Sequence, residues 1–173
     1  MPKVIVLGIF YWFSAIDNLL YAAVVDCTGH GLPGAFMSLI GKTLLNQIIN
    51  EWRTKDPAML LEIMHEQVRQ ALNQDTSNSK AHAGMDVCLV AVNRVENKAI
   101  FAVARGPLYV VQNGAVSIVK GDPRSVGGYQ REEKRYFNNH SIDLSKGTSL
   151  YLTTDGYLDQ MNPALKIWSA KIC

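Results

Sequence analysis

Two short stretches near the start of the chain are rich in β-branched and aromatic residues. The first runs from Val4 to Phe13 and the second from Leu19 to Val25, with turn residues at Asp17 and Asn18 between them. Runs of this composition, bounded by turn residues, are typical of paired strands. The pattern therefore predicts a β-hairpin at the start of the domain.

After residue 32 the spacing of apolar residues changes to that of helices. Pro33 suits the first turn of a helix, whose apolar positions continue to about Trp52. A second helix is predicted to follow Asp56, the expected N-cap, with Pro57 at the first helical position. One face of this second helix is apolar and consists of Leu60, Ile63, Met64, Val68, Ala71 and Leu72.

A polar loop at residues 75–84 separates the helices from a series of short strands. Apolar and polar residues then alternate with a period of two over residues 85–95, 99–104, 108–112 and 115–121. Residues 148–154 are predicted to form a further strand. Because helices and strands do not alternate along the chain, we predict an α+β fold with mainly antiparallel sheets rather than a doubly wound parallel sheet.

The composition is that of one globular domain, which we assign to residues 1–173. Apolar residues make up 48% and charged residues 18% of the chain. The net charge of +2 is too small and too dispersed to predict binding to nucleic acid. The three cysteines lie far apart without a C-x-x-C spacing, which predicts reduced thiols in the cytoplasm. The apolar residues 1–13 are too few to span a bilayer, so no membrane association is predicted.

A glycine-rich segment at residues 29–34 matches the G-x-G-x-x-G pattern of dinucleotide-binding turns. That fingerprint requires a helix leading into a parallel strand, whereas here a second helix follows the first. The triplet Gly41-Lys42-Thr43 resembles the end of a phosphate-binding P-loop. However, Phe36 occupies the position of the first glycine of that loop. We therefore reject both nucleotide-binding interpretations.

Two aspartates are predicted to end strands next to glycine-containing turns. Asp26 follows the second strand of the hairpin, and Asp155 follows the strand at residues 148–154. Carboxylates from separate strands can converge on hard cations such as Mg²⁺ and Mn²⁺. The alternative is that each aspartate only stabilises its own turn, as this residue often does. The spacing leaves both interpretations open.

Three sequence blocks carry a resemblance to a known family. They read AAVVDCTGHGLPGAFMSLIG, GMDVCLVAVNRVENKAIFAVARGPLYVV and LYLTTDGYLDQMN. Together they resemble the metal-dependent PPM-type serine/threonine phosphatases, in the branch of sporulation stage II protein E. The similarity is strongest over residues 6–163. It implies a four-layer α-β-β-α sandwich with mainly antiparallel sheets, in agreement with the predicted order of elements.

The resemblance also implies a reaction and a set of metal ligands. Phosphoserine or phosphothreonine would be hydrolysed by a water molecule activated between two Mn²⁺ or Mg²⁺ ions. On this template Asp26 bridges the two ions, the main-chain carbonyl of Cys27 binds one of them, and Asp155 binds the other.

Four further residues belong to the candidate site. Gly29 and Gly31 are expected to let the backbone turn tightly beside the metal ions. His30 is expected to form local hydrogen bonds, with protonation of the leaving group as the alternative role. Asp86 matches an acid typical of this branch, and we expect it either near the metals or facing a turn.

Two features depart from the family pattern. The first strand of the family reads SGDFYWF and its aspartate serves the metal site, whereas here the segment reads LGIFYWF with Ile9 at that position. The chain also reads ALKIWSAKIC after Pro163, without the paired-acid motif that the family carries there. We therefore expect a sandwich that is incomplete at its C-terminal end, a weakened metal site, and a free sheet edge through which a homodimer could form.

The sequence thus supports three functional interpretations. The first is a cytoplasmic protein phosphatase that depends on Mn²⁺ or Mg²⁺ and acts on a phosphorylated regulatory protein of the anti-sigma-factor-antagonist type. The second is a catalytically impaired domain of the same fold that binds a regulatory partner. The third is a truncated gene fragment.

Overall fold

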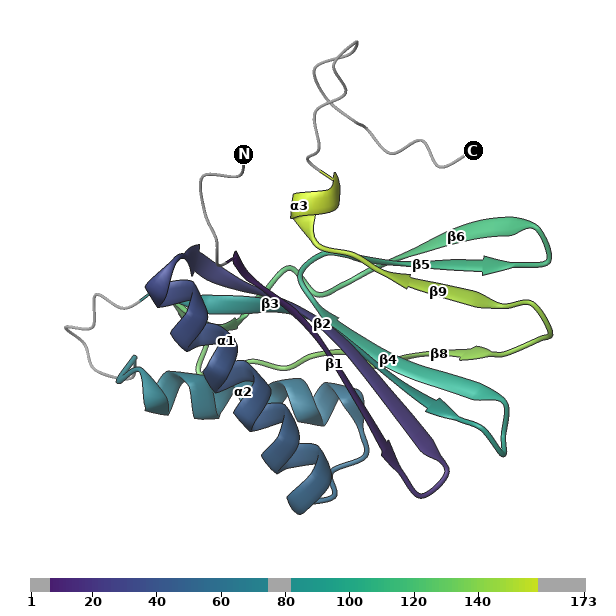
Figure 1. The fold of residues 1–173 in the computed structure, drawn as a ribbon, viewed down its shortest axis with the longest axis horizontal. Helices are drawn as coiled ribbons and strands as arrows, with labels where there is room; N and C mark the ends of the chain where they lie inside the picture. Colours follow the sequence, from purple (N-terminus) through teal and green to yellow (C-terminus); the bar gives the residue numbers. More distant parts are fainter. Residues whose placement is uncertain (1–6, 75–81, 159–173) are drawn as a thin grey trace, which may run out of the picture.

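In the computed structural model, which describes residues 7–74 and 82–158, two antiparallel sheets pack face to face (Figure 1). The larger sheet has the order β1 (Leu7–Ile16), β2 (Leu19–His30), β3 (Gly84–Asn93), β4 (Lys98–Ala104) and β8 (His140–Asp143), and β7 (Val126–Gly127) pairs with β3. The smaller sheet has the order β6 (Ala115–Lys120), β5 (Pro107–Gln112) and β9 (Ser149–Leu152).

The helices lie on the face of the larger sheet that points away from the smaller one (Figure 1). They are α1 (Leu32–Leu45), which continues as a π-helical segment η1 (Asn46–Glu51), and α2 (Pro57–Ala71). A short helix, α3 (Asp155–Leu158), follows β9. The described residues therefore form three layers, α-β-β, of the expected sandwich.

Side chains of the central strands point alternately to the two faces of the larger sheet and so belong to two separate cores. In β3, Val87 and Leu89 pack with the helices, whereas Cys88 and Val90 pack against β5 and β9. Strand side chains point alternately to opposite faces, so an apolar residue at nearly every position of β3 serves both layers. This double burial explains why the predicted strand at residues 85–95 is almost continuously apolar.

The predicted fold class is confirmed, and so are several local features. Asp56 caps α2 by accepting a hydrogen bond from the main-chain N–H of Met59 at 2.8 Å, and Pro57 begins the helix. The first predicted helix also continues to Glu51, with its last segment π-helical. The Nε1–H of Trp12 donates a hydrogen bond to Asn46 Oδ1 at 2.9 Å and so attaches β1 to this π-helical segment.

Several predicted boundaries were wrong, and two strands were missed. β2 does not end at Val25 but continues to His30, because its residues from Leu19 to Cys27 pair with β3 and His30 pairs with Leu7 of β1. Asp155 does not end a strand, since β9 stops at Leu152 and Asp155 begins α3. β7 and β8 were not predicted at all, because strands of two and four residues leave too short a pattern of alternation. The predicted start of the first strand at Val4 lies outside the described residues.

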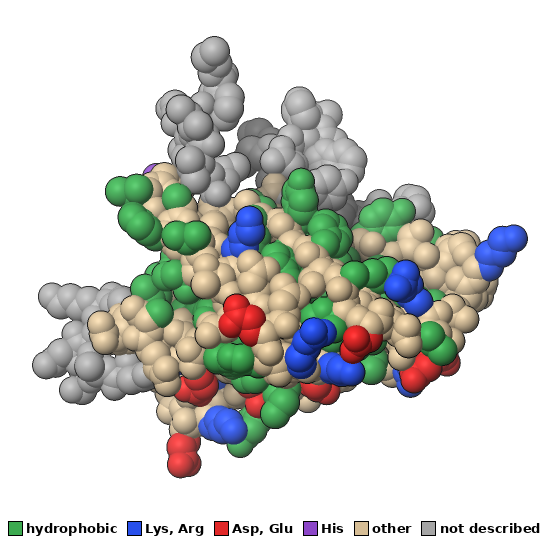
Figure 2. All heavy atoms as spheres, turned by 60° about the horizontal axis from the view of Figure 1, so that its bottom comes forward, with side chains coloured by type: hydrophobic (Ala, Val, Ile, Leu, Met, Phe, Trp, Pro, Cys, Tyr) green, Lys and Arg blue, Asp and Glu red, His purple; other side chains and the backbone are tan. Residues whose placement is uncertain are grey.

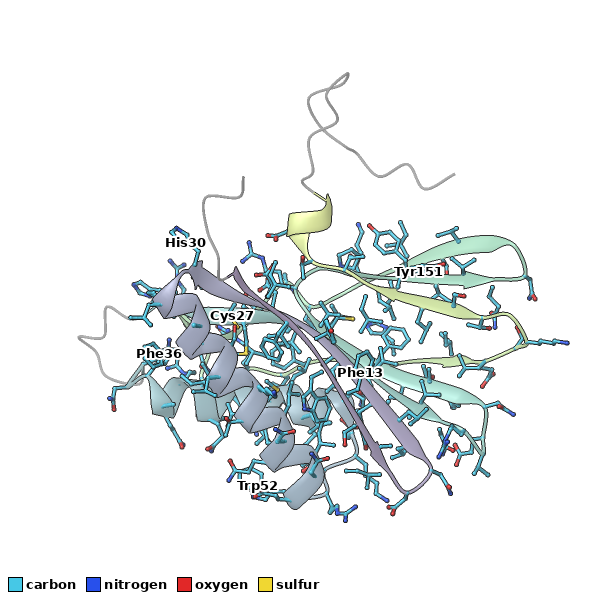
Figure 3. All side chains as sticks on the ribbon, viewed as in Figure 1. Phe13, Cys27, His30, Phe36, Trp52 and Tyr151 are labelled. Carbon is cyan, nitrogen blue, oxygen red and sulfur yellow. The ribbon has the colours of Figure 1, made fainter. Side chains whose placement is uncertain are left out.

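The edge strand β1 carries exposed aromatic side chains. Tyr11 and Phe13 are exposed, and Phe13 is labelled on this strand in Figure 3. β1 pairs with β2 on one side only within the described part of the chain, so its other edge has free main-chain groups. These features fit the predicted homodimer, which stays a prediction.

The face of the molecule shown in Figure 2 has no concentration of one charge. Figure 2 shows acidic and basic side chains interspersed with hydrophobic ones over the face that it presents. Within residues 7–74 and 82–158, no helix is both long enough and apolar enough to cross a bilayer. Cys27 and Cys88 are free and buried.

A fully buried histidine connects α2 to the segment around β7. His65 Nδ1 accepts a hydrogen bond from the main-chain N–H of Gly127 at 2.9 Å, so the proton of the neutral ring lies on Nε2. That nitrogen lies 2.7 Å from Gln130 Oε1 and donates to it. Burial lowers the pKa of His65, the nearby Arg135 acts in the same direction, and the hydrogen bond to Gln130 opposes them.

This neutral histidine predicts a loss of stability in mild acid. Below pH 6.5, the ordinary pKa of histidine, the unfolded chain binds a proton at His65 that the folded chain does not bind. The free energy of unfolding should then fall by at most about 1.4 kcal/mol per pH unit. Urea denaturation of the wild type and of His65→Gln between pH 7.5 and pH 5 measures the contribution of His65, since contributions from other groups are common to both proteins. If the free energy of unfolding changed with pH in the same way in both proteins, His65 would make no such contribution.

Candidate functional site

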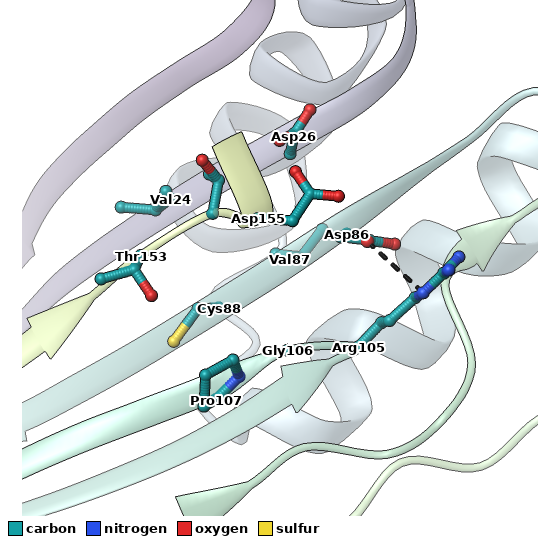
Figure 4. Close-up of a pocket in the computed structure, with 11 residues that line it drawn as sticks. Val24, Asp26, Asp86, Val87, Cys88, Arg105, Gly106, Pro107, Thr153 and Asp155 are labelled. Carbon is teal, nitrogen blue, oxygen red and sulfur yellow. Dashed lines mark ion pairs between the residues drawn. The ribbon is translucent and has the colours of Figure 1, made fainter. Parts of the chain in front are cut away.

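Three aspartates line one pocket between the two sheets (Figure 4). Asp26 comes from β2, Asp86 from β3 and Asp155 from the first residue of α3. The pocket has a volume of about 210 Å³. The other side chains in its wall are mostly apolar or small and include Val24, Cys88, Pro107, Thr153 and Thr154, with Arg105 at one side.

The register of the larger sheet brings two of these acids together. Asp26 lies directly opposite Asp86, and Val24 lies opposite Cys88 one step along the same face. This face points away from α1 and α2, because the alternate residues Val25 and Cys27 pack with the helices. Both carboxylates therefore point into the space between the sheets.

Asp155 reaches the same place from the smaller sheet. β9 ends at Leu152, and Thr153 and Thr154 lead the chain across the pocket to α3. The first residue of α3, Asp155, thus lies beside Asp26 of β2 (Figure 4). Residues that are far apart in the sequence meet here because the two sheets are stacked.

The proximity of the carboxylates changes the acidity of Asp26. Burial raises its pKa to about 6, and both the charge of Asp155 and a hydrogen bond with it act in the same direction. Asp86 adds a smaller contribution of the same sign. Like charges in a partly desolvated pocket favour the protonated form of one of them. A bound cation would relieve this repulsion.

Asp86 is directed toward groups on the other side of the pocket. Its Oδ1 accepts a hydrogen bond from the Ser125 hydroxyl at 2.5 Å, and its Oδ2 lies 3.8 Å from Arg105 Nε. Burial raises the pKa of Asp86, whereas Ser125 and Arg105 act against this rise. The structure therefore places Asp86 beside the Asp26–Asp155 pair but engages its oxygens elsewhere.

The donors present are of the type that Mg²⁺ and Mn²⁺ prefer, namely carboxylate and carbonyl oxygens. Among the residues that the structure describes, however, no three His, Cys, Asp or Glu side chains form a group that could hold a metal ion. An ion would need other oxygen ligands besides the carboxylate pair. The Cys27 carbonyl, a reoriented Asp86 or water molecules could supply these oxygens.

Cys27 can serve the pocket only through its main chain. Its side chain packs in the core between β2 and the helices (Figure 3), where burial raises the pKa of the thiol to about 11. Its carbonyl oxygen lies against Gly8 of β1, because a Cβ added at Gly8 would come within 2.7 Å of that oxygen. The ligand role of this carbonyl stays a prediction.

Gly29 and Gly31 both have positive φ, and their predicted place beside metal ions stays a prediction. Gly29 has φ of 99° and Gly31 has φ of 65°, values that side-chain-bearing residues rarely adopt. His30 lies between them at the end of β2, with its side chain exposed (Figure 3), and it is not among the residues that line the aspartate pocket. Its role stays a prediction.

Ile9 occupies the position on β1 opposite Asp26. Its Cδ1 would lie 3.7 Å from a Cβ added at Gly156, the residue after Asp155. The isoleucine side chain therefore extends from β1 toward α3, beside the carboxylate pair. It fills this place without offering an oxygen ligand.

Sequence reasoning missed two polar residues of the site, Arg105 and Ser125. Arg105 follows β4 with φ of 61°, and Gly106 follows it with φ of 106°. An arginine before Gly-Pro at the end of a strand was a signal for a tight turn that carries a positively charged side chain. No local pattern points to Ser125, whose role depends on its contact with Asp86, a residue 39 positions away in the sequence.

Comparisons with known proteins agree with this architecture. The family model described as stage II sporulation protein E matches residues 17–171. The SiaA-PP2C domain of Pseudomonas aeruginosa is 31% identical, with a TM-score of 0.78 over 92% of this chain and 60% of that one. The chain thus spans less than two thirds of the length of this relative. No curated protein sequence matches the chain significantly.

Two further solved structures share the fold at lower identity. A structure of the PP2C phosphatase domain and a fragment of the regulatory domain of the cell fate determinant SpoIIE from Bacillus subtilis is 17% identical, with a TM-score of 0.64 over 88% of this chain and 42% of that one. RsbX in complex with magnesium is 13% identical, with a TM-score of 0.60 over 86% of this chain and 66% of that one. Given the family match over most of its length, the chain belongs to the stage II sporulation protein E family and has the PP2C phosphatase fold.

Proposed function

We propose that the chain is a metal-dependent serine/threonine phosphatase domain that acts on a phosphorylated regulatory protein. The observation that carries this proposal is the convergence of Asp26 and Asp155 in one pocket, where the pKa of Asp26 is raised to about 6. Structural acids that only stabilise turns have no need to meet across two sheets. Family membership supports the reaction class.

Asp26, Asp155 and the Cys27 carbonyl are the groups that would hold Mn²⁺ or Mg²⁺. When bound, a pair of such ions supplies Lewis acidity and a water molecule of low pKa for in-line attack on phosphorus. Asp26 must be deprotonated to act as a ligand, which its pKa of about 6 allows at neutral pH. Arg105, at the side of the pocket, can donate to the phosphate oxygens of the substrate.

The proposed substrate is a phosphoserine or phosphothreonine on a regulatory protein of the anti-sigma-factor-antagonist type. The sequence blocks shared with the stage II sporulation protein E branch support this class of partner. The magnesium complex of RsbX, which has the same fold, supports a divalent cation as the cofactor. A location in the cytoplasm is part of the same proposal.

One observation favours a second candidate function, a domain that binds its partner but hydrolyses phosphate poorly. Ile9 extends toward the carboxylate pair from the position at which related phosphatases have an aspartate. It leaves the site with fewer charged ligands, which weakens metal binding. Binding of a regulatory protein that persists in chelator would favour this alternative.

The test is release of phosphate from a phosphoserine protein and from p-nitrophenyl phosphate, with Mn²⁺ or with chelator. We expect turnover that requires Mn²⁺ and saturates only at millimolar concentration, because the site lacks a carboxylate at Ile9. Circular dichroism of the same sample shows whether the protein is folded. A folded protein without turnover at millimolar Mn²⁺ would refute the phosphatase assignment for this chain.

A further inference from the structure

A second hollow lies next to the aspartate pocket and shares Arg105 with it. It has a volume of about 260 Å³, and its wall is mostly polar. Its lining includes Thr28, Gly84, Arg105, Arg124, Ser125 and Tyr129. Basic side chains therefore gather beside a pocket lined by three acids.

The two pockets lie along the same face of the β2–β3 pair. Asp26 is opposite Asp86 in the antiparallel pair. Two residues farther along this pair, Thr28 of β2 lies beside Gly84 of β3. The main-chain N–H of Gly84 donates to Thr28 Oγ1 at 3.2 Å, which keeps these positions together. Two residues along a strand span roughly 7 Å. The Thr28–Gly84 side of the hollow therefore lies about that far from Asp26 and Asp86. Its Arg105–Ser125 side adjoins Asp86.

One arginine of the hollow serves the fold. Arg135 is buried, and its Nε donates to Glu132 Oε1 at 2.6 Å. Its other nitrogens donate to the main-chain carbonyls of Ser125, Gly127 and Tyr129. Arg135 thus uses four of its five N–H donors to fix the loop that forms the wall of the hollow.

The other two arginines keep their donors. Arg105 Nε lies 3.8 Å from Asp86 Oδ2, and Arg124 Nη1 lies 3.9 Å from Glu132 Oε2, distances beyond a hydrogen bond. Their side chains are 67% and 56% exposed, and Glu132 is already engaged by Arg135. Each guanidinium group therefore has one carboxylate nearby and keeps N–H donors that can bind a further anion.

We propose that this hollow binds an acidic side chain of the substrate, two residues away from the phosphorylated residue. The inference rests on the proposed function, which places the phosphate at the aspartate pocket. In an extended peptide, side chains two residues apart point the same way and lie roughly 7 Å apart. This spacing matches the step from the Asp26–Asp86 pair to the Thr28–Gly84 pair. A carboxylate at that position meets Arg124, while Arg105, which lines both pockets, stays with the phosphate.

The test uses short fluorescein-labelled phosphoserine peptides with glutamate two residues before, glutamate two residues after, or alanine at both positions. Fluorescence anisotropy at low salt measures their binding to the wild type, to Arg124→Gln and to Lys134→Gln. The last variant is a matched control, because Lys134 is not part of the hollow and contacts the ring of Tyr136. We expect about fivefold tighter binding of one glutamate peptide by the wild type and by Lys134→Gln. The preference should disappear in Arg124→Gln and weaken with added salt.

The same peptides without phosphate separate this inference from the proposed function. A glutamate preference that remains in the unphosphorylated peptides, without any turnover of the phosphorylated ones, would support the hollow and count against the phosphatase assignment. Turnover with equal affinity for glutamate and alanine peptides would refute the proposed binding of an acidic side chain in the hollow but not the phosphatase assignment. A glutamate preference that Arg124→Gln leaves unchanged would also refute the proposed role of the hollow.

Discussion

Replacing Ile9 by aspartate is expected to tighten the binding of Mn²⁺ by about a hundredfold to a thousandfold. Ile9 lies opposite Asp26 on β1 and extends toward the residue after Asp155. A carboxylate there would add a unit charge in contact with the ion, worth roughly 4 kcal/mol at the effective dielectric constant of partly exposed sites. That energy corresponds to about three orders of magnitude in the dissociation constant, and incomplete alignment of the new ligand lowers the gain.

Isothermal titration of Mn²⁺ into the wild type and Ile9→Asp measures this effect, and phosphate release measures its consequence for turnover. Phe13→Asp is the matched control, because Phe13 is exposed on the same strand four residues farther on and pairs with Ala22, which does not line the pocket. Equal affinities for Ile9→Asp and Phe13→Asp would show that only the net charge matters. That result would contradict the assignment of Ile9 to the metal site.

The fold class was predictable because its strongest signals are local. Within the part of the chain that the structure describes, period-two runs and helical spacing identified seven of the nine strands and both long helices, since each of these elements buries one or both faces. The missing strands, β7 and β8, depend on partners distant in the sequence. β8 is recognisable as a strand only through its pairing with residues 98–101 of β4. Such pairing leaves no periodic pattern in four residues.

The site was predictable only in part, for a related physical reason. The sequence singles out Asp26 and Asp155 because each follows an apolar strand, but their meeting depends on the stacking of two sheets. The extension of β2 beyond Asp26 was missed, since Gly29 weakens the strand pattern although pairing with β3 continues through Cys27. Arg105 was missed because an isolated cation in a turn is common. Its importance comes from its position between the two pockets.

Asp26→Asn is expected to abolish metal-dependent turnover and at the same time to stabilise the metal-free protein. The pKa of Asp26 is raised from 3.8 to about 6, so the folded state binds its proton more tightly than the unfolded state does. The stability gained from this proton is complete below pH 3.8 and is lost as the pH rises through about 6. At neutral pH the ionised carboxylate therefore destabilises the fold. An uncharged asparagine removes the repulsion from Asp155 and Asp86.

After discounting for the partial exposure of Asp26, we expect a gain of about 1 kcal/mol in chelator, equivalent to about 2–4 °C in Tm. Thermal denaturation with and without Mn²⁺ tests the gain in stability and the loss of metal binding, and phosphate release tests the loss of turnover. Added Mn²⁺ should raise the Tm of the wild type, because an ion that binds only the folded state stabilises it, and should leave Asp26→Asn unchanged. Asp143→Asn, at an exposed position of β8, controls for the change in net charge. If Asp26→Asn instead lost stability in chelator, the three carboxylates would not repel one another, and the pocket would be a structural hydrogen-bond cluster rather than a cation site.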